Sequence, residues 1–386
     1  MGKNKKILLY LLIFAVLGSG ALFGGFYFRN FDKIHAQTTE SSEFKDILNP
    51  ADTSSKSGLQ KVVFRIDNAG DVDRQVEDYL RNLYPIISDK AIEQIESSKW
   101  INKFLMNDSL GIVEFYANFY VPKYYLEPHP KILWELNIAA FESHIYQIFN
   151  GDTVLIDTWP NVLGKPSTKT YTGHYEAFRL RNWPFWKDPE SSDSVRPTPP
   201  GPANPLGLFV VHYDENSLRY FHGTNKNYLL KNEYRALSHG CVRNLNENIA
   251  RMKEFIIKKV VVSEDLYSWL GSKKTMTFEM KDEDKFPVRI IYKTFDIRRD
   301  DFGDYIIFYK DVYDYSRGAK LSEYDDPNLI TFASLDNILA EFKLRHSALQ
   351  IPDEKIIPII NNLLSNHEYY QKYYFDDLVK EQTQNN

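Results

Sequence analysis

The sequence predicts a mostly β domain with some helices, preceded by an apolar N-terminal helix and flanked by small mixed α/β regions. Between residues 132 and 262, short strand candidates alternate with glycine and proline, as is typical of β domains. Residues 7–28 form an uncharged, mostly apolar run, and the residues from about 334 onward look helical before a polar tail.

The bulk composition is that of a folded protein, with 43% hydrophobic and 26% charged residues among 386. The formal net charge is −5, and it becomes −9 without residues 1–36, which hold five bases and one acid. Nucleic-acid binders present a basic surface, so the composition argues against that class. The single cysteine, Cys241, excludes an internal disulfide and is either an inert buried thiol or a reactive one.

The N-terminal run 7–28 is long enough to cross a bilayer, because a helix of this length spans roughly 33 Å. Three lysines precede it, which predicts a cytoplasmic N-terminus and an exported remainder. A cleaved signal peptide ending at Ala36 is the alternative, but the run is long for one and Ala36 lies eight residues beyond it. We therefore expect a single-pass protein of the cytoplasmic membrane with an extracytoplasmic domain, which would be periplasmic in a Gram-negative cell.

By composition and hydrophobic pattern, the rest of the chain divides into five segments. We expect a flexible polar tether (37–60), an accessory region of unknown role (61–128), a catalytic domain (129–263), a β-hairpin extension (264–320) and a helical C-terminal region (321–386). Within the accessory region, the patterns predict strands at 62–64 and 112–121 around a helix at 72–84. In the extension, residues 286–308 resemble one hairpin that turns near 300–303. Strands of the central domain are predicted at 132–141, 144–149, 154–159, 208–213 and 218–222.

Two further segments flank the later strands. Residues 189–205 hold six prolines, which predicts an irregular, ordered loop over a site. Residues 245–259 predict a helix, and Asn244 and Glu247 have the offset of a capping box at its start. The apolar face of this helix would consist of Leu245, Ile249, Met252, Phe255 and Ile256.

The chemistry is concentrated in His222-Gly223-Thr224 and Ser238-His239-Gly240-Cys241-Val242-Arg243-Asn244. A thiol attacks a carbonyl as the thiolate, and a nearby imidazole can accept its proton. His222 ends a predicted strand, and Cys241 precedes the predicted helix, whose N-terminus would favour the thiolate and an oxyanion. The N–H groups of Gly240 and Cys241 are candidate oxyanion donors.

Each of these residues has a plainer interpretation. A Cys–His pair can be coincidental, and His212, His222, His239 and Cys241 could ligate zinc, although their spacing matches no usual zinc pattern. We interpret His239 as a structural histidine of the turn rather than as a second base. Arg243 either binds a substrate carboxylate or forms a salt bridge within the protein.

These segments resemble the signature of the L,D-transpeptidases with a YkuD-type catalytic domain, in which His-Gly-Thr is followed by Ser-His-Gly-Cys-x-Arg. Two upstream segments, 162–170 with Gly-Lys-Pro and 200–207 with Pro-Gly-Pro, resemble further motifs of that family in the right order. The region 287–313 resembles, more weakly, the larger YcbB-like members. The long substrate-capping insertion of those members is short here, and no standard peptidoglycan-binding repeat precedes the domain.

The resemblance implies a sandwich of mixed sheets with helices, on which Cys241 and His222 face each other across a groove. It implies that Cys241 attacks a peptidoglycan tetrapeptide stem to form a thioester, and that the side-chain amine of a diamino acid on a second stem then gives a 3→3 cross-link. His222 would act as base and acid, oriented by the Gly223 carbonyl, with Ser238, His239, Gly240 and Arg243 around the substrate. Neither a metal nor a cofactor is required.

Two other classes remain open at this point. The same residues would serve an L,D-carboxypeptidase, or another cysteine hydrolase, in which water replaces the acceptor amine. A non-catalytic wall-binding protein is the third possibility, although the intact Cys241, His222 and Arg243 argue against it.

Overall fold

The computed structural model describes residues 58–384 except 68, 108–111, 189–190, 218, 262 and 346–350. Within this part of the chain, no helix is long and apolar enough to cross a membrane. The predicted anchor over 7–28 and nearly all of the predicted tether lie outside the described residues. Residues 59–386 form one compact unit, which contains every element described below.

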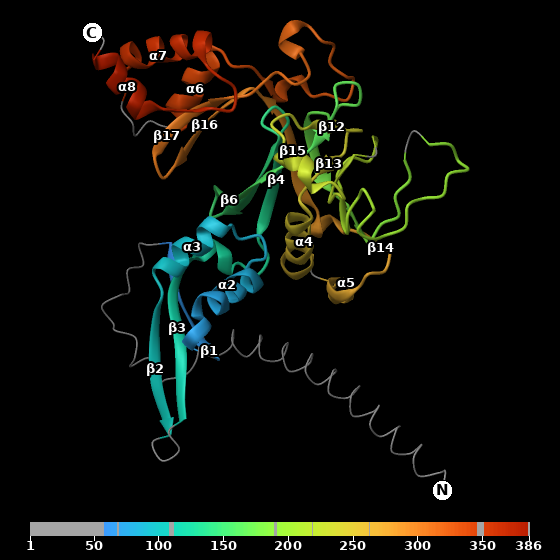
Figure 1. The fold of residues 1–386 in the computed structure, drawn as a ribbon, viewed down its shortest axis with the longest axis vertical. Coiled ribbons are helices and arrows are strands. Elements are labelled where there is room, and N and C mark those ends of the chain that lie inside the picture. The colour runs from blue at the N-terminus through green and yellow to red at the C-terminus, as the bar shows by residue number, and fades with distance from the viewer. Residues whose placement is uncertain are drawn as a thin grey trace. The chain divides into compact units, whose positions relative to one another are not determined.

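The first part of this unit is a three-stranded antiparallel sheet with two helices. Its order is β1-β3-β2. The elements are β1 (Leu59–Ile66), α2 (Val72–Leu83), α3 (Asp89–Ser97), β2 (Trp100–Asn107) and β3 (Ile112–Pro122), all labelled in Figure 1. Helix α2 forms because Val76, Leu80 and Leu83 recur on one face, and this face is buried. The helix and the strands predicted at 62–64 and 112–121 are therefore present.

The largest sheet has six strands and mixed pairing. Its order is β18-β15-β4-β5-β6, with β8 pairing with β15 off this path. The strands are β4 (Lys131–Asn137), β5 (Glu142–Phe149), β6 (Asp152–Pro160), β8 (Gly173–Ala177), β15 (Phe286–Lys293) and β18 (Ile330–Thr331). Strand β15 runs parallel to β4 although some 150 residues separate them, a long-range pairing that the local pattern does not predict.

A second sheet of five strands carries the segments singled out by the sequence. Its order is β13-β11-β10-β9-β14. The strands are β9 (Arg179–Asn182), β10 (Phe209–His212), β11 (Tyr220–His222), β13 (Val242–Arg243) and β14 (Met276–Glu279). A short parallel pair, β7 (Leu163–Gly164) with β12 (Ala236–Ser238), is formed by residues of the same motifs. The described structure is mostly β with some helices, as the sequence predicts.

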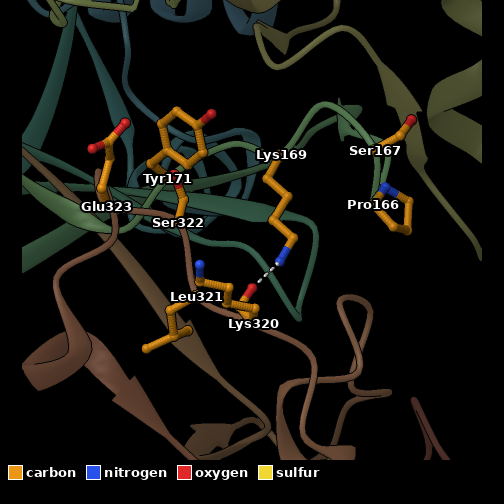
Figure 2. A pocket seen from close by; sticks show the side chains of 8 residues that line it. All are labelled: Pro166, Ser167, Lys169, Tyr171, Lys320, Leu321, Ser322 and Glu323. Atoms are coloured by element: carbon orange, nitrogen blue, oxygen red, sulfur yellow. Dashed lines mark hydrogen bonds between the residues drawn. The ribbon is translucent and has the colours of Figure 1, made fainter.

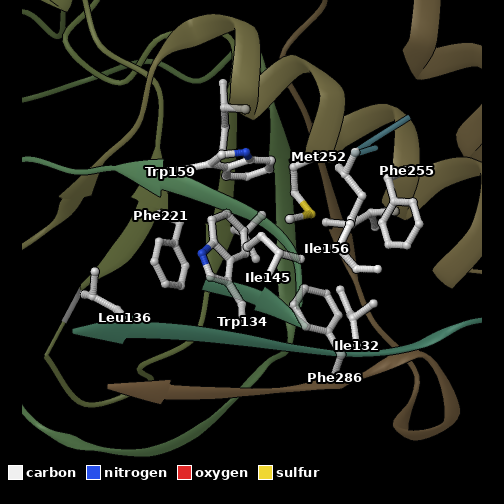
Figure 3. Close-up of a cluster of buried hydrophobic side chains, with 14 of the residues drawn as sticks. Ile132, Trp134, Leu136, Ile145, Ile156, Trp159, Phe221, Met252, Phe255 and Phe286 are labelled. Carbon is white, nitrogen blue, oxygen red and sulfur yellow. The ribbon is translucent and has the colours of Figure 1, made fainter. Parts of the chain in front are cut away.

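The main hydrophobic core joins these sheets and helix α4. Trp134 of β4 stacks on Phe221 of β11 with ring centroids 3.9 Å apart, and Trp159 of β6 meets Trp134 edge-on. Figure 3 shows these three rings together with Met252 and Phe255 of α4. Burial of such large side chains supplies most of the stabilisation of a domain. Here it also fixes the position of β11 through its core-facing side.

Helix α4 (Asn246–Phe255) continues as a π-helical turn, Ile256–Val260, where the sequence predicts one helix over 245–259. Ile249, Met252, Phe255 and Ile256 are fully buried, as their spacing predicts. The predicted capping box is wrong, because Leu245 is the N-cap and no side chain caps the helix. Asn244 is instead buried and donates to the carbonyl of His222.

The C-terminal part has its own hydrophobic core. It consists of the sheet β16-β17-β19 and three helices. Its elements are β16 (Phe295–Asp300), β17 (Gly303–Phe308), α6 (Leu335–Arg345), α7 (Asp353–Asn366), β19 (Lys372–Tyr374) and α8 (Phe375–Gln384). The prediction of one hairpin over 286–308 is wrong. The turn at 300–303 joins β16 to β17, whereas β15 belongs to the six-stranded sheet.

Candidate active site

The predicted nucleophile and base come from neighbouring parallel strands. Phe221 pairs with Val242 and His222 with Arg243, so Tyr220 lies beside Cys241. Successive side chains of a strand point to opposite faces. Phe221 and Val242 are fully buried in the core, and the other face of the two strands, called here the site face, carries Tyr220, His222, Cys241 and Arg243. Cys241 and His222 are diagonal neighbours on this face, about 7–8 Å apart at Cα and within reach of long side chains.

His222 is buried, with 3% of its surface exposed. Its Nδ1 lies 2.6 Å from the carbonyl oxygen of Gly223, and since a carbonyl only accepts, Nδ1 carries the proton and Nε2 is the basic nitrogen. Burial and the neighbouring Arg243 lower the pKa of His222 to about 3, although the carbonyls of Gly223 and Leu206 act in the opposite direction. The imidazole is therefore neutral at pH 7.

Cys241 is half-buried, and burial raises the pKa of its thiol. Tyr220, Arg219 and Arg243 lower that pKa, but burial dominates. Because burial dominates, the Cys241 thiol and the His222 imidazole are both neutral at rest. Part of the reason is that α4 begins five residues after Cys241, with β13 in between, so the helix N-terminus is not adjacent to the sulfur.

The turn before Cys241 is fixed by Ser238. This buried serine donates through Oγ to the carbonyl of Cys241 (2.6 Å) and accepts from the N–H of Gly240 (3.1 Å). The Gly240 N–H is therefore engaged within the turn, which argues against its predicted use as an oxyanion donor, and the Cys241 N–H stays the candidate. Gly240 has φ +111°, a conformation that L side chains rarely adopt. His239 is exposed between the buried Ser238 and Gly240.

Arg243 is half-buried, and hydrogen bonds anchor its backbone. Its N–H and C=O both pair with Val162. Among the described residues, no carboxylate lies within ion-pairing distance of Arg243. Burial lowers the pKa of Arg243, and only Cys241 and Tyr228 act against this. The salt bridge that would make Arg243 purely structural is not present in this part of the chain.

The structure adds a second guanidinium, Arg219, which the sequence motifs do not include. Its Nε donates to the carbonyl of Lys169 (2.7 Å), and its Cζ lies 3.8 Å from the ring centroid of Tyr171. It also packs so closely on Gly240 that a Cβ there would lie 2.7 Å from Nε. No local pattern marks Arg219, because its position depends on the distant loop 166–171. Tyr220 could have been found, since strand alternation places it on the face of His222.

Hydrogen bonds from the upstream motifs and from α4 stabilise the segments around the site. Thr170 donates through Oγ1 to the carbonyl of Gly240 (2.8 Å), which ties the segment 162–170 to the nucleophile turn. Asn204 is fully buried and donates to the carbonyls of Pro184 and Pro199, so it fixes the proline-rich loop. Asn246 accepts from the N–H of Thr224 and donates to its carbonyl, and this clamps the end of β11 onto α4.

The described residues contain no group of three or more His, Cys, Asp or Glu side chains that could hold a metal ion. His212 is buried beside Tyr220, with ring centroids 4.8 Å apart. Burial and the nearby Arg181 and Arg179 lower the pKa of His212 to about 4, so it is a neutral member of the same face.

Comparison with known families assigns the central segment. Residues 137–262 match the YkuD family model, which describes an L,D-transpeptidase catalytic domain. The resemblance drawn from the motifs is thereby confirmed for this segment, which contains the site face and the nucleophile turn. A search of curated proteins finds no match to the chain.

Several solved structures are similar over part of their length. A mutant of the helical cell shape determining protein Pgp2 from Campylobacter jejuni shares 11% identity over 43% of this chain and 48% of its own, with a TM-score of 0.24. Bd1075 of Bdellovibrio bacteriovorus shares 12% over 42% and 48%, with a TM-score of 0.23. A mutant of Enterococcus faecium L,D-transpeptidase shares 14% over 59% and 86%, with a TM-score of 0.24. The chain thus spans about half the length of the first two.

Proposed function

We propose that this protein is a peptidoglycan L,D-transpeptidase that forms its acyl-enzyme on Cys241. The observation that carries the proposal is the register of β11 and β13. This register places three groups on one face of a sheet: the only cysteine of the chain, a neutral buried imidazole and the Arg243 guanidinium. Among the described residues, this guanidinium has no carboxylate partner. The match of residues 137–262 to the L,D-transpeptidase catalytic domain supports the same chemistry.

In the first step, the Cys241 sulfur attacks the carbonyl carbon of the third residue of a donor tetrapeptide. His222 Nε2 takes the thiol proton during the attack, because both groups are neutral at rest, and returns it to the amine of the departing D-alanine. The C–N bond breaks and a thioester remains on Cys241. The Gly223 carbonyl holds the proton of His222 on Nδ1 and so leaves Nε2 as the base.

In the second step, the side-chain amine of a diamino acid on another stem attacks the thioester. Its proton passes through His222 back to the sulfur, the C–S bond breaks, and a 3→3 cross-link is released with the thiol regenerated. Arg219 stabilises negative charge on the sulfur in both steps, since it lowers the pKa of the Cys241 thiol. Arg243 binds the terminal carboxylate of the donor stem. The Cys241 N–H serves as oxyanion donor.

The substrate requires the domain to lie outside the cytoplasm, and we propose that residues 7–28 anchor it in the membrane with the N-terminus inside. The anchor has an independent test. Sequencing the N-terminus of the protein from the membrane fraction should recover the initial residues. A soluble protein whose N-terminus begins near Gln37 would refute the anchor and leave the enzyme proposal standing.

The reaction itself is tested with the purified full chain and tetrapeptide-bearing muropeptides. Mass spectrometry of the products should show cross-linked dimers, and intact-protein mass spectrometry should show an adduct that Cys241→Ala lacks. Tripeptide without dimer would mean that the protein is an L,D-carboxypeptidase. A folded protein that binds muropeptides without any product or adduct would mean that it is a non-catalytic wall-binding protein.

A further inference from the structure

A pocket of about 600 Å³ lies next to the nucleophile turn, between two segments that are far apart in the sequence. One wall is the loop 166–171 of the central domain, and the other is the segment 320–323, beyond the part that matches the catalytic-domain family. Its polar lining residues are Ser167, Lys169, Tyr171, Lys320, Ser322 and Glu323, shown in Figure 2. A pocket of this size lies in the usual range for small-ligand sites, so it can take one end of a stem peptide.

Hydrogen bonds hold the two walls together. The hydroxyl of Tyr313 donates to the carbonyl of Gly164 (2.8 Å) and accepts from the N–H of Thr170 (3.0 Å). The N–H of Thr172 donates to the buried Asp325 (3.0 Å). The pocket is therefore built into the fold by buried contacts on both sides.

The first wall is also the support of the nucleophile turn. On the side away from the pocket, Thr168 and Thr170 donate to the carbonyls of Ser238 (3.1 Å) and Gly240 (2.8 Å). Arg219, which packs on Gly240, lies over the ring of Tyr171, and that ring lines the pocket. One loop thus separates the pocket from Cys241.

The charge in the pocket is set by Lys169. This half-buried ammonium donates to the carbonyl of Lys320 (3.0 Å) and lies 4.2 Å from the ring centroid of Tyr315. Among the described residues, no carboxylate lies within ion-pairing distance of it. Burial lowers its pKa, and the more distant Asp325 and Asp311 act in the opposite direction. An ammonium has three donors, so Lys169 has capacity for an anionic ligand. Lys320 adds a second cation to the lining, and Glu323 is its one carboxylate.

We propose that this pocket binds a carboxylate of the acceptor stem peptide. The inference rests on the proposed function and adds the acceptor site to it. The donor is fixed by its reacting carbonyl on the site face, where Arg243 lies, whereas the pocket lies across the loop 166–170 from the nucleophile turn. A group bound here is therefore not the reacting carbonyl of the donor, and the proposal assigns it to the second stem. Glu323 suits a backbone N–H group of such a stem, and the reacting side-chain amine stays free to attack the thioester.

The test uses preformed acyl-enzyme of the full chain mixed with a tripeptide acceptor that ends in the diamino acid. Lys169→Gln and Lys320→Gln should each raise the acceptor concentration at half-maximal rate, by roughly tenfold to a hundredfold for Lys169, because a charge-assisted contact is lost. Lys310→Gln is the matched control, since this exposed lysine pairs with Glu233 outside the pocket. An acceptor with amidated carboxylates should react alike with wild type and variants.

An unchanged half-saturating concentration in Lys169→Gln, or an equal loss with both acceptors, would overturn the proposal. Failure of the proposed function is separable, because it would appear earlier as absence of any adduct on Cys241. In that case calorimetric titration of the tripeptide into Cys241→Ala still decides the matter. Heat of binding that disappears in Cys241→Ala/Lys169→Gln supports the pocket, and no heat in Cys241→Ala refutes it.

Discussion

Two regions of the molecule contain partly buried charged side chains. One lies beside Cys241, and the other lies where β5, β15 and β16 meet. The two regions differ in the partners of these charges. Beside Cys241, the half-buried Arg219 and Arg243 have no carboxylate partner among the described residues. Arg219 is held by backbone carbonyls and a tyrosine ring instead. Both cations lower the pKa of the Cys241 thiol.

The second region, called here the ionic cluster, pairs every cation with a carboxylate. Arg298 contacts Glu142 (2.9 Å) and Asp296 (2.7 Å), and Lys293 contacts Asp296 (3.1 Å) and Glu341 of α6. The full ionic cluster is Glu135, Glu142, His144, Arg289, Lys293, Asp296, Arg298 and Glu341. It ties the six-stranded sheet to the C-terminal part of the chain.

The comparison indicates that the two regions have different roles, one in stability and one in chemistry. Half-buried cations with carboxylate partners are satisfied within the fold, and removing one partner leaves an uncompensated charge. Half-buried cations without such partners remain available to an anionic thiol, oxyanion or substrate. Substitutions in the ionic cluster should therefore change stability, and those beside Cys241 should change chemistry.

The largest effect is expected for the reacting pair. Cys241→Ala should abolish turnover and adduct formation, because no neighbouring side chain can replace the nucleophile. His222→Ala should lower the rate by about 10²–10⁴, the usual contribution of a general base and acid. Steady-state assays of folded variants with muropeptides measure both. Near wild-type rates in either variant would remove that residue from the mechanism.

The ionic cluster should respond in the opposite way. Asp296→Ala removes one of the two carboxylate partners of both Arg298 and Lys293, so we expect a loss of roughly 1–3 kcal/mol in the free energy of unfolding. At temperatures where the variant stays folded, its kcat on muropeptides should match wild type. Urea unfolding followed by fluorescence gives the first quantity. An intact unfolding midpoint combined with lost activity would contradict the comparison.

Arg219 should act on the thiol without acting on stability. It lowers the pKa of Cys241, so Arg219→Gln should raise that pKa further above its ordinary value. Alkylation by iodoacetamide requires the thiolate, and its rate at pH 7 should fall several-fold, with the pH profile displaced to higher pH. The matched variant Arg317→Gln, an exposed arginine, should follow the wild-type profile. Coincident profiles for Arg219→Gln and wild type would exclude this role.

The smallest effect concerns His144 in the ionic cluster. Burial alone would lower its pKa, but Glu135 and Glu142, 3.7 and 3.8 Å away, raise it above the ordinary value. The stability it contributes is therefore complete below about pH 6.5 and is lost as pH rises through the raised pKa. Urea midpoints between pH 6 and pH 9 should decline in wild type and less so in His144→Gln. Parallel declines would assign the trend to other groups.

Features that depend on local information could be predicted from the sequence. The motif around Cys241 and the strand that ends at His222 lie within 25 residues, so pattern and spacing were enough to predict them. The apolar face of α4 was predicted for the same reason, since Ile249, Met252 and Phe255 follow the helical period.

Features that depend on distant segments could not be predicted in this way. Strand β13 forms only by pairing with β11 and Val162, and it occupies part of the stretch between Cys241 and the start of α4 at Asn246. Ser238 Oγ takes the Gly240 N–H that had been expected to bind an oxyanion. Arg219 reaches Gly240 only because the loop 166–171 supplies its partners.

The most direct test of the central claim compares Arg243→Gln with wild type on two tetrapeptide donors, one with a free terminal carboxylate and one amidated. Arg243 has no carboxylate partner among the described residues, so we expect the melting temperature of Arg243→Gln to stay unchanged. On the donor with a free terminal carboxylate, kcat/KM should fall roughly tenfold to a hundredfold. The deficit should largely vanish on the amidated donor. A clear drop in melting temperature, with an equal loss of kcat/KM on both donors, would mean that Arg243 stabilises the fold and does not bind the donor carboxylate.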